Sequence, residues 1–142
     1  MFSLRKFCFM FKTKKGHCAL KTERIIVEPK DLALFIAKSA LDKQALSVEI
    51  INVEGKTSYT DYLVICSGRS VRHVEAITDG VEMDIKKEKV YPLGVEGRQS
   101  GEWILMDYGD VIFHIFEDNK RGFYDLEGLW IDAKRIPNPE DS

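Results

Sequence analysis

The fold is decided by a hairpin signal in residues 103–116, which have the sequence WILMDYGDVIFHIF. Two apolar runs flank Gly109-Asp110, a dipeptide that suits a two-residue β-turn. With this turn, Tyr108 pairs with Val111, and successive cross-strand pairs alternate between the two faces. The stretch therefore predicts an antiparallel hairpin whose register is fixed by its turn.

Both faces of this hairpin are largely apolar, so neither is a typical solvent face. One face carries Ile104, Met106, Tyr108, Val111, Phe113 and Ile115, and the other carries Trp103, Leu105, Asp107, Ile112, His114 and Phe116. One face must meet the helices of the fold, while the other meets either a second helical layer or a partner protein. Large apolar anchors with one aspartate and one histidine are typical of an interface hot spot. Sequence alone leaves both alternatives open.

A strand, a tight turn and a helix precede the hairpin. The continuous apolar run of residues 62–66 predicts a strand covered on both faces. Ser67-Gly68-Arg69-Ser70 ends this strand, and Ser70 is suited to be the N-cap of a helix. Apolar residues then recur at intervals of three and four, which predicts an amphipathic helix; they are Val71, Val74, Ile77, Val81 and Ile85.

Four further elements complete the predicted α/β domain. Pro29 and Asp31 begin a helical pattern, residues 47–53 predict a strand, and residues 92–97 predict a short extended piece. A final helix is expected over residues 121–130. Its apolar side would consist of Phe123, Leu126, Leu129 and Trp130.

Composition limits the class of protein. The chain has 142 residues, of which 44% are hydrophobic and 31% charged, as in a single soluble domain with a real core. Residues 1–22 hold six basic residues and no acid, so the remainder carries 15 basic and 23 acidic residues. An acidic body is a poor ligand for phosphate backbones and suits a basic protein partner. We therefore expect no direct nucleic-acid readout and no membrane association.

Residues 1–22 are expected to be a basic, disordered extension, residues 23–136 the folded domain, and residues 137–142 a tail. The apolar run of residues 7–11 is too short for a signal peptide or a membrane span. A basic, acid-free segment also fits an organelle transit peptide, although a single arginine and a single serine argue against one. A start codon placed too early is the third alternative.

Few side chains suggest catalysis, a metal or a cofactor. His73 and His114 could each act as a general base, but a helix start and a mid-strand position favour structural roles. Cys66 lies in an apolar run and is predicted to be a small buried hydrophobe. The three cysteines are too scattered for a zinc site. We predict no catalytic residue, no metal and no cofactor.

The enzymatic alternative is a nucleotidyltransferase-like protein. Gly68-Arg69-Ser70 could hold an anion at a helix N-terminus, but it lacks the Walker and GxGxxG patterns. Asp107 and Asp110 flank a turn instead of alternating on one strand face. This alternative requires Asp61, Asp107 and Asp110 to converge within metal-binding reach.

Six segments, in order over about residues 31–131, together resemble one family. They are DYLVICSGRS (61–70), RHV (72–74), PLGVEG (92–97), EWILMDYGDV (102–111), HIF (114–116) and FYDLE with LW (123–127, 129–130). The combination closely resembles the ribosomal silencing factor family, also called Iojap. Gly122 and Gly128 lie within the expected terminal helix and should weaken it, because glycine has a low helix propensity.

The resemblance implies a single compact α/β domain in which helices flank a mixed sheet of about five strands, similar to nucleotidyltransferases. It implies a repressor of translation that binds the fourteenth L-series protein of the large ribosomal subunit at the intersubunit face. The bound factor would block joining of the small subunit sterically, without enzymatic activity. Family members also form dimers, so a dimeric adaptor is a third alternative.

The resemblance also places the partner-binding surface and the compartment. The expected contact residues are Trp103, Leu105, Met106, Asp107 and Tyr108, with Ser67, Gly68, Arg72 and His73 as a flank. The expected location is the cytoplasm. Organelle members of the family make a mitochondrion or plastid the alternative, should residues 1–22 be a transit peptide.

Overall fold

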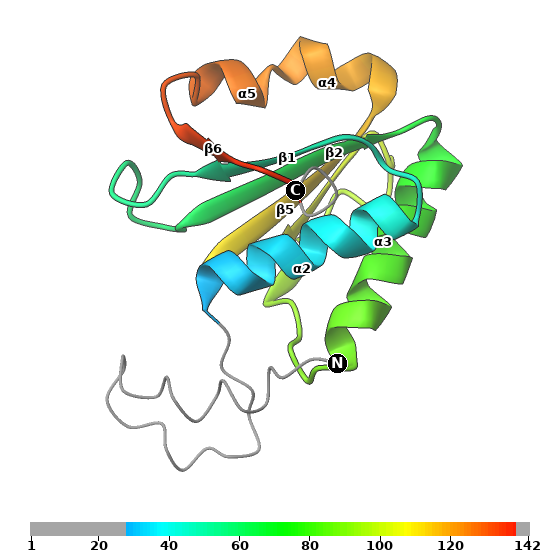
Figure 1. Ribbon diagram of the computed structural model, residues 1–142. Coiled ribbons are helices and arrows are strands. Elements are labelled where there is room, and N and C mark those ends of the chain that lie inside the picture. The colour runs from blue at the N-terminus through cyan, green and yellow to red at the C-terminus, as the bar shows by residue number, and fades with distance from the viewer. Residues whose placement is uncertain (1–27, 139–142) are drawn as a thin grey trace.

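A six-stranded mixed sheet runs through residues 28–138, the part of the chain that the computed structural model describes. The strand order is β3-β4-β5-β2-β1-β6, and helices lie on both sides of the sheet (Figure 1). Along the chain the elements are α2 (Pro29–Asp42), β1 (Leu46–Asn52), β2 (Tyr62–Gly68), α3 (Val71–Lys86), β3 (Gly94–Glu96), β4 (Trp103–Asp107), β5 (Val111–Glu117), α4 (Asp118–Tyr124), α5 (Leu126–Leu129) and β6 (Lys134–Ile136). The predicted α/β class with a mixed sheet is confirmed.

The predicted hairpin and its register are confirmed in β4 and β5. Asp107 lies opposite Ile112, and the Tyr108 amide donates to the Val111 carbonyl at 2.9 Å. Gly109 turns the chain with φ +90°, a conformation that glycine adopts without steric cost. Strand β5 also pairs in parallel with β2, which places β2 in the middle of the sheet, as its continuous apolar run predicted.

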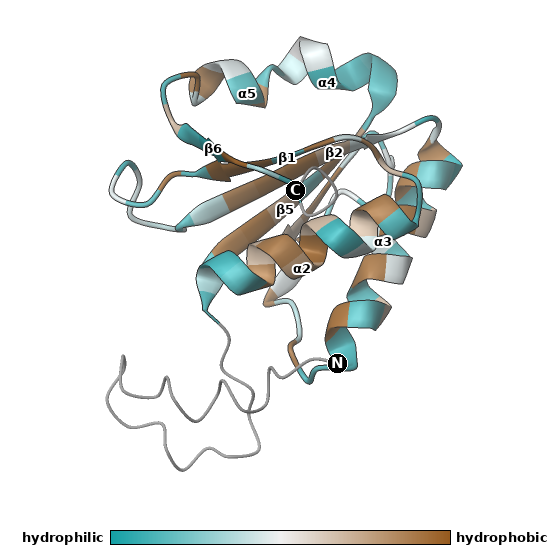
Figure 2. Ribbon diagram, in the orientation of Figure 1, coloured by the Kyte–Doolittle hydropathy of each residue, from teal (hydrophilic) through white to brown (hydrophobic). Residues whose placement is uncertain are grey.

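The first face of the sheet packs against α2 and α3. Figure 2 shows hydrophobic residues along the central strands and on both of these helices. Helix α3 begins at its predicted N-cap, because the Ser70 hydroxyl accepts a hydrogen bond from the His73 amide. The side chains buried on this face include Val64, Cys66, Ile77, Val81, Ile104, Met106, Tyr108, Phe113 and Ile115. This face forms the larger part of the core.

The second face of the sheet packs against α4, α5 and the connection to β6 (Figure 1). Its buried residues are Ile51, Val53, Leu63, Ile65, Ile112, Phe116 and Ala133. Trp103, Leu105, Leu126 and Trp130 pack against them and stay partly exposed. Helices therefore reach both faces, but the second face is covered only in part.

The C-terminal region differs from its prediction. The single helix expected over residues 121–130 is wrong, because Asp125 adopts a left-handed conformation (φ 44°) that separates α4 from α5. Leu129, expected on the apolar side, is 68% exposed. A sixth strand, β6, joins the edge of β1, with Asn52 opposite Lys134.

Some expectations concern residues that the structure does not describe. The extension over residues 1–22, the proposed boundary at residue 23 and most of the C-terminal tail lie outside residues 28–138. Within that described range, each helix is too short or too polar to cross a lipid bilayer.

Candidate functional site

Trp103, at the start of β4, is held from three sides on the second face. Its indole Nε1 donates a hydrogen bond to His114 Nδ1 at 3.1 Å. Its ring stacks on Phe116 with centroids 5.1 Å apart, and the Tyr124 ring lies 4.6 Å away. The indole is half-buried. A large side chain with a fixed orientation and an accessible edge is thus presented at the surface.

His114 supports this arrangement from the neighbouring strand β5. Burial lowers the pKa of its imidazole to about 4, because the charged form is poorly solvated there. The neutral ring can accept the indole hydrogen bond at Nδ1, which an imidazolium could not. The prediction of a hydrogen-bonded structural histidine is confirmed.

Strand alternation divides the five predicted contact residues of β4 and its turn. Trp103, Leu105 and Asp107 lie on the second face and are half-exposed. Met106 and Tyr108 lie on the first face, where they are buried in the core. Because side chains alternate along a strand, one contiguous segment cannot present all five to one partner.

The flank at the β2–α3 turn is divided in the same way. Ser67 and Gly68 are buried at the end of β2, His73 is half-buried, and Arg72 is exposed at the start of α3. Of these four predicted flank residues, Arg72 and part of His73 are therefore the ones that reach the surface.

His73 braces the turn between β2 and α3. Its Nδ1 accepts a hydrogen bond from the Arg69 amide at 2.9 Å. The proton therefore resides on Nε2, which donates to the Lys43 carbonyl at 3.0 Å. His73 thus joins this turn to the loop after α2, and it supports the loop as the sequence suggested.

The chemistry required by the enzymatic alternative is not assembled among the described residues. Nowhere in residues 28–138 do three or more His, Cys, Asp or Glu side chains gather so that they could hold a metal ion. The Asp107 carboxylate instead accepts a hydrogen bond from the Gly109 amide and stabilises the hairpin turn. Cys66 is fully buried, and burial raises the pKa of its thiol to about 12, as expected for a packing residue.

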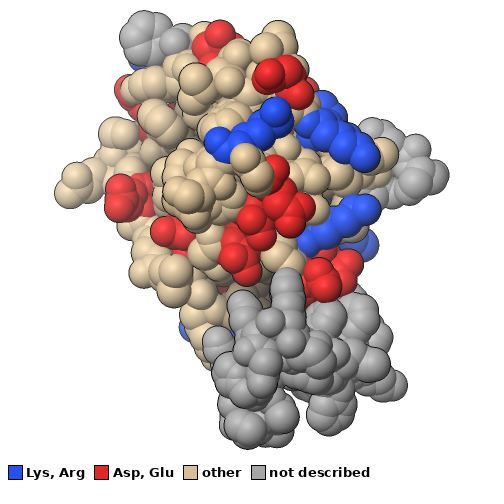
Figure 3. Space-filling view, turned by 90° about the vertical axis from the view of Figure 1, so that its left-hand side faces the viewer, with Lys and Arg blue, Asp and Glu red and all other residues tan. Residues whose placement is uncertain are grey.

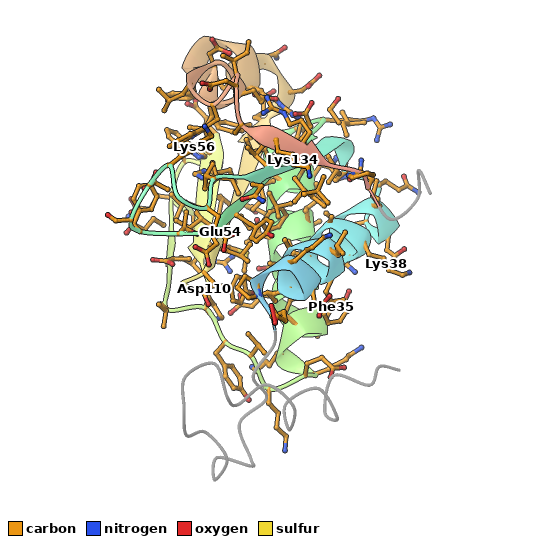
Figure 4. All side chains as sticks on the ribbon, turned by 60° about the vertical axis from the view of Figure 1, so that its left-hand side comes forward. Phe35, Lys38, Glu54, Lys56, Asp110 and Lys134 are labelled. Atoms are coloured by element: carbon orange, nitrogen blue, oxygen red, sulfur yellow. The ribbon has the colours of Figure 1, made fainter. Side chains whose placement is uncertain are left out.

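Acidic side chains gather at the end of the sheet where the β4–β5 turn meets the β1–β2 loop. The Asp61 amide donates to the Asp110 carbonyl at 3.0 Å, which joins these two loops. Burial, together with the nearby carboxylates of Glu54 and Asp61, raises the pKa of Tyr62. Figure 3 shows red side chains grouped on this side of the molecule, and Figure 4 places Glu54 and Asp110 near each other. This end of the sheet therefore carries a cluster of negatively charged side chains.

Two residues of α4 on the second face, Tyr124 and Arg121, were not predicted as site residues. Tyr124 contacts the indole, and Arg121 is buried beneath the same helix. Tyr124 belongs to one of the segments that carry the family resemblance, but no spacing pattern connects it to Trp103. The contact depends on where α4 lies over the sheet.

Comparison with family models gives a match over residues 27–142 to a family described as "Ribosomal silencing factor during starvation". A ribosomal silencing factor of Zymomonas mobilis is 40% identical over 103 residues, which cover 72% of this chain and 77% of the relative. A crystal structure of a Chromobacterium violaceum protein is similar with a TM-score of 0.72 at 27% identity. That similarity covers 80% of this chain and 93% of the other.

An organelle protein is also similar. The mouse protein named "Mitochondrial assembly of ribosomal large subunit protein 1" is 32% identical over 91 residues. The match covers 62% of this chain but 40% of the mouse protein, so the two share one region of a longer relative.

Proposed function

The chain belongs to the ribosomal silencing factor family, and from this premise we propose that it binds the fourteenth L-series protein of the large ribosomal subunit and represses translation. Membership of the family places the protein in the regulation of translation. The partner protein, the contact surface and the block of subunit joining are proposals. The observation that carries them is a half-exposed Trp103, held in one orientation on a sheet face that helices cover only in part.

The rigidity of the anchor supports a role in recognition. A side chain that is already ordered loses little conformational entropy on binding, so more of its contact energy contributes to affinity. Tryptophan is also the residue type most enriched among interface hot spots. Leu105 and Asp107 lie on the same face of β4 and would extend the contact.

Charge supports a basic partner. Residues 102–118, which include the whole hairpin, contain five acidic residues and no lysine or arginine. Such a field accelerates encounter with a positively charged protein surface, while the apolar anchor sets how long the complex lasts. Arg72 at the flank would meet an acceptor at the rim of the contact.

The proposed mechanism is steric. A factor bound at the intersubunit face of the large subunit would occupy space that the small subunit needs, and no bond would be made or broken. We propose the cytoplasm as the site of action, with an organelle as the alternative that residues 1–22 leave open.

Binding to isolated large subunits tests the proposal. The protein should sediment with large subunits at low salt, and its addition to whole ribosomes should increase the fraction of free subunits. Binding should weaken as salt screens the charges. Failure to sediment with large subunits at low salt would refute the proposed function. The solution mass with and without subunits would show whether a second copy competes for the same face.

Trp103→Ala is the sharpest variant for this surface. We expect binding to weaken roughly thirtyfold, the effect of losing one hot-spot residue, while the domain stays folded. Tyr59→Ala is the matched control, because Tyr59 is an exposed aromatic residue in the β1–β2 loop and is not among the residues that pack on the second face. If both variants bind large subunits equally well, Trp103 is not the anchor of the contact.

A further inference from the structure

Arg121 on α4 is a charged side chain buried in the fold, with 9% of its surface exposed. Its Nη1 donates to the Ser67 hydroxyl at 2.9 Å, and its Nε donates to Glu127 Oε2 at 2.7 Å. Nη2 pairs with the same carboxylate oxygen. Burial of a guanidinium is unfavourable unless it is paired and hydrogen-bonded, and here both conditions are met.

This network joins three separate pieces of the chain. Ser67 lies near the end of β2, Arg121 on α4 and Glu127 on α5. The connection between the two helices bends at Asp125, and no residue of α5 is fully buried. Apolar packing of α5 is therefore limited, and the paired guanidinium fixes both short helices relative to the sheet.

Helix α4 also contacts Trp103, the proposed anchor, through Tyr124. Tyr124 follows Arg121 by less than one helical turn, and its ring packs against both Trp103 and Phe116. A shift of α4 would carry Tyr124 away from the indole. The edge of Trp103 would then be presented in a different environment.

We propose that Arg121 is a positioning residue for the docking surface. It holds α4 in the place where Tyr124 fixes the indole of Trp103, without contacting the partner itself. The role in docking rests on the proposed function, whereas the effect on Trp103 can be measured in the isolated protein.

The first measurement uses the free, full-length protein. In a ¹H–¹⁵N spectrum the indole Nε1 proton of Trp103 reports its hydrogen bond to His114, and a Trp103→Phe variant distinguishes it from the indole of Trp130. Arg121→Met should shift this resonance or broaden it. An unmoved resonance in folded Arg121→Met would overturn the proposal.

The second measurement is affinity for isolated large subunits. Arg121→Met should bind about tenfold more weakly, less than the loss for Trp103→Ala, because the anchor remains but is misaligned. Arg121→Lys keeps the charge but lacks the planar guanidinium that reaches both Ser67 and Glu127. Its affinity should therefore lie between those of wild type and Arg121→Met. If Arg121→Met does not fold, Arg121→Lys and Glu127→Gln provide both readouts.

Asp84→Asn is the matched control. Asp84 on α3 forms a partly buried ion pair with Lys43 at 2.7 Å on the first face, away from Trp103. The Asp84→Asn variant should have a lower melting temperature, but its Trp103 resonance and its affinity for large subunits should stay unchanged. An Arg121 variant that weakens binding no more than Asp84→Asn would overturn the positioning role. Absence of binding by the wild-type protein would refute the proposed function and leave the spectral test of Arg121 intact.

Discussion

The two faces of the sheet differ in how they are covered. The first face lies under α2 and α3, which have 14 and 16 residues and contribute rows of fully buried side chains. The second face lies under α4 and α5, which have seven and four residues, and Trp103 and Leu105 remain partly exposed beside them. The first face is therefore closed by its own helices, whereas the second face leaves large apolar side chains available for the contact proposed above.

The largest expected effect is a loss of stability on the first face. Phe113 is fully buried there, so Phe113→Ala should lower the free energy of unfolding by about 3–5 kcal/mol. Leu105→Ala, on the opposite face of the adjacent strand, should cost only about 1 kcal/mol, because Leu105 is half-exposed. Urea denaturation of both variants measures the difference. Equal losses would remove the distinction between the two faces.

The next largest effect is a pH dependence of stability that arises from His114 on the second face. The pKa of His114 is lowered by burial from 6.5 to about 4, so between these values the unfolded chain binds a proton that the folded protein does not. Stability should therefore be complete above pH 6.5 and decrease as the pH falls toward 4, by about 3 kcal/mol at most.

Denaturation of wild type and His114→Gln across this range checks the assignment. Glutamine can still accept the indole hydrogen bond but does not titrate, so its curve should be flatter. Asp84 contributes at lower pH: burial raises its pKa, but hydrogen bonds from Lys43 and Ser39 outweigh this, and the net pKa is lowered. Its contribution is present above the ordinary aspartate range and is lost below it. An equally steep decrease in His114→Gln would assign the dependence to another group.

The smallest effects concern the two glycines of the second-face helices. A Cβ at Gly122 meets no atom within 4 Å, so Gly122→Ala should stabilise the protein by about 0.5–1 kcal/mol. A Cβ at Gly128 would meet the Asp125 carboxylate that caps its amide, so Gly128→Ala should cost about 1 kcal/mol. In thermal melts, the melting temperature should rise for Gly122→Ala and fall for Gly128→Ala if α4 and α5 are placed as described.

Local patterns were sufficient for most of the fold. The turn at Gly109 determined the register of β4 and β5, and the three-and-four spacing from Val71 determined α3. The continuous apolar run of β2 indicated its central position. Each of these signals is contained within about twenty consecutive residues.

The remaining features depend on contacts between distant residues. Strand β6 has three residues and is recognisable only through its pairing with β1. The break at Asp125 and the pairing of Arg121 with Ser67 have no signature in spacing. For the candidate site, a contiguous block of resemblance proposes neighbouring residues of β4 together and does not separate the half-exposed Trp103 from the buried Met106.

The pairing of β6 with β1 has a consequence for the order in which the chain folds. Asn52 is synthesised long before Lys134, its partner across the strands. Until the last residues of the domain emerge, this edge of β1 offers unpaired amides and carbonyls, which readily template pairing with another chain. Truncation before residue 134 should leave this edge of β1 unpaired, and we expect the shortened chain to aggregate more readily than the full chain.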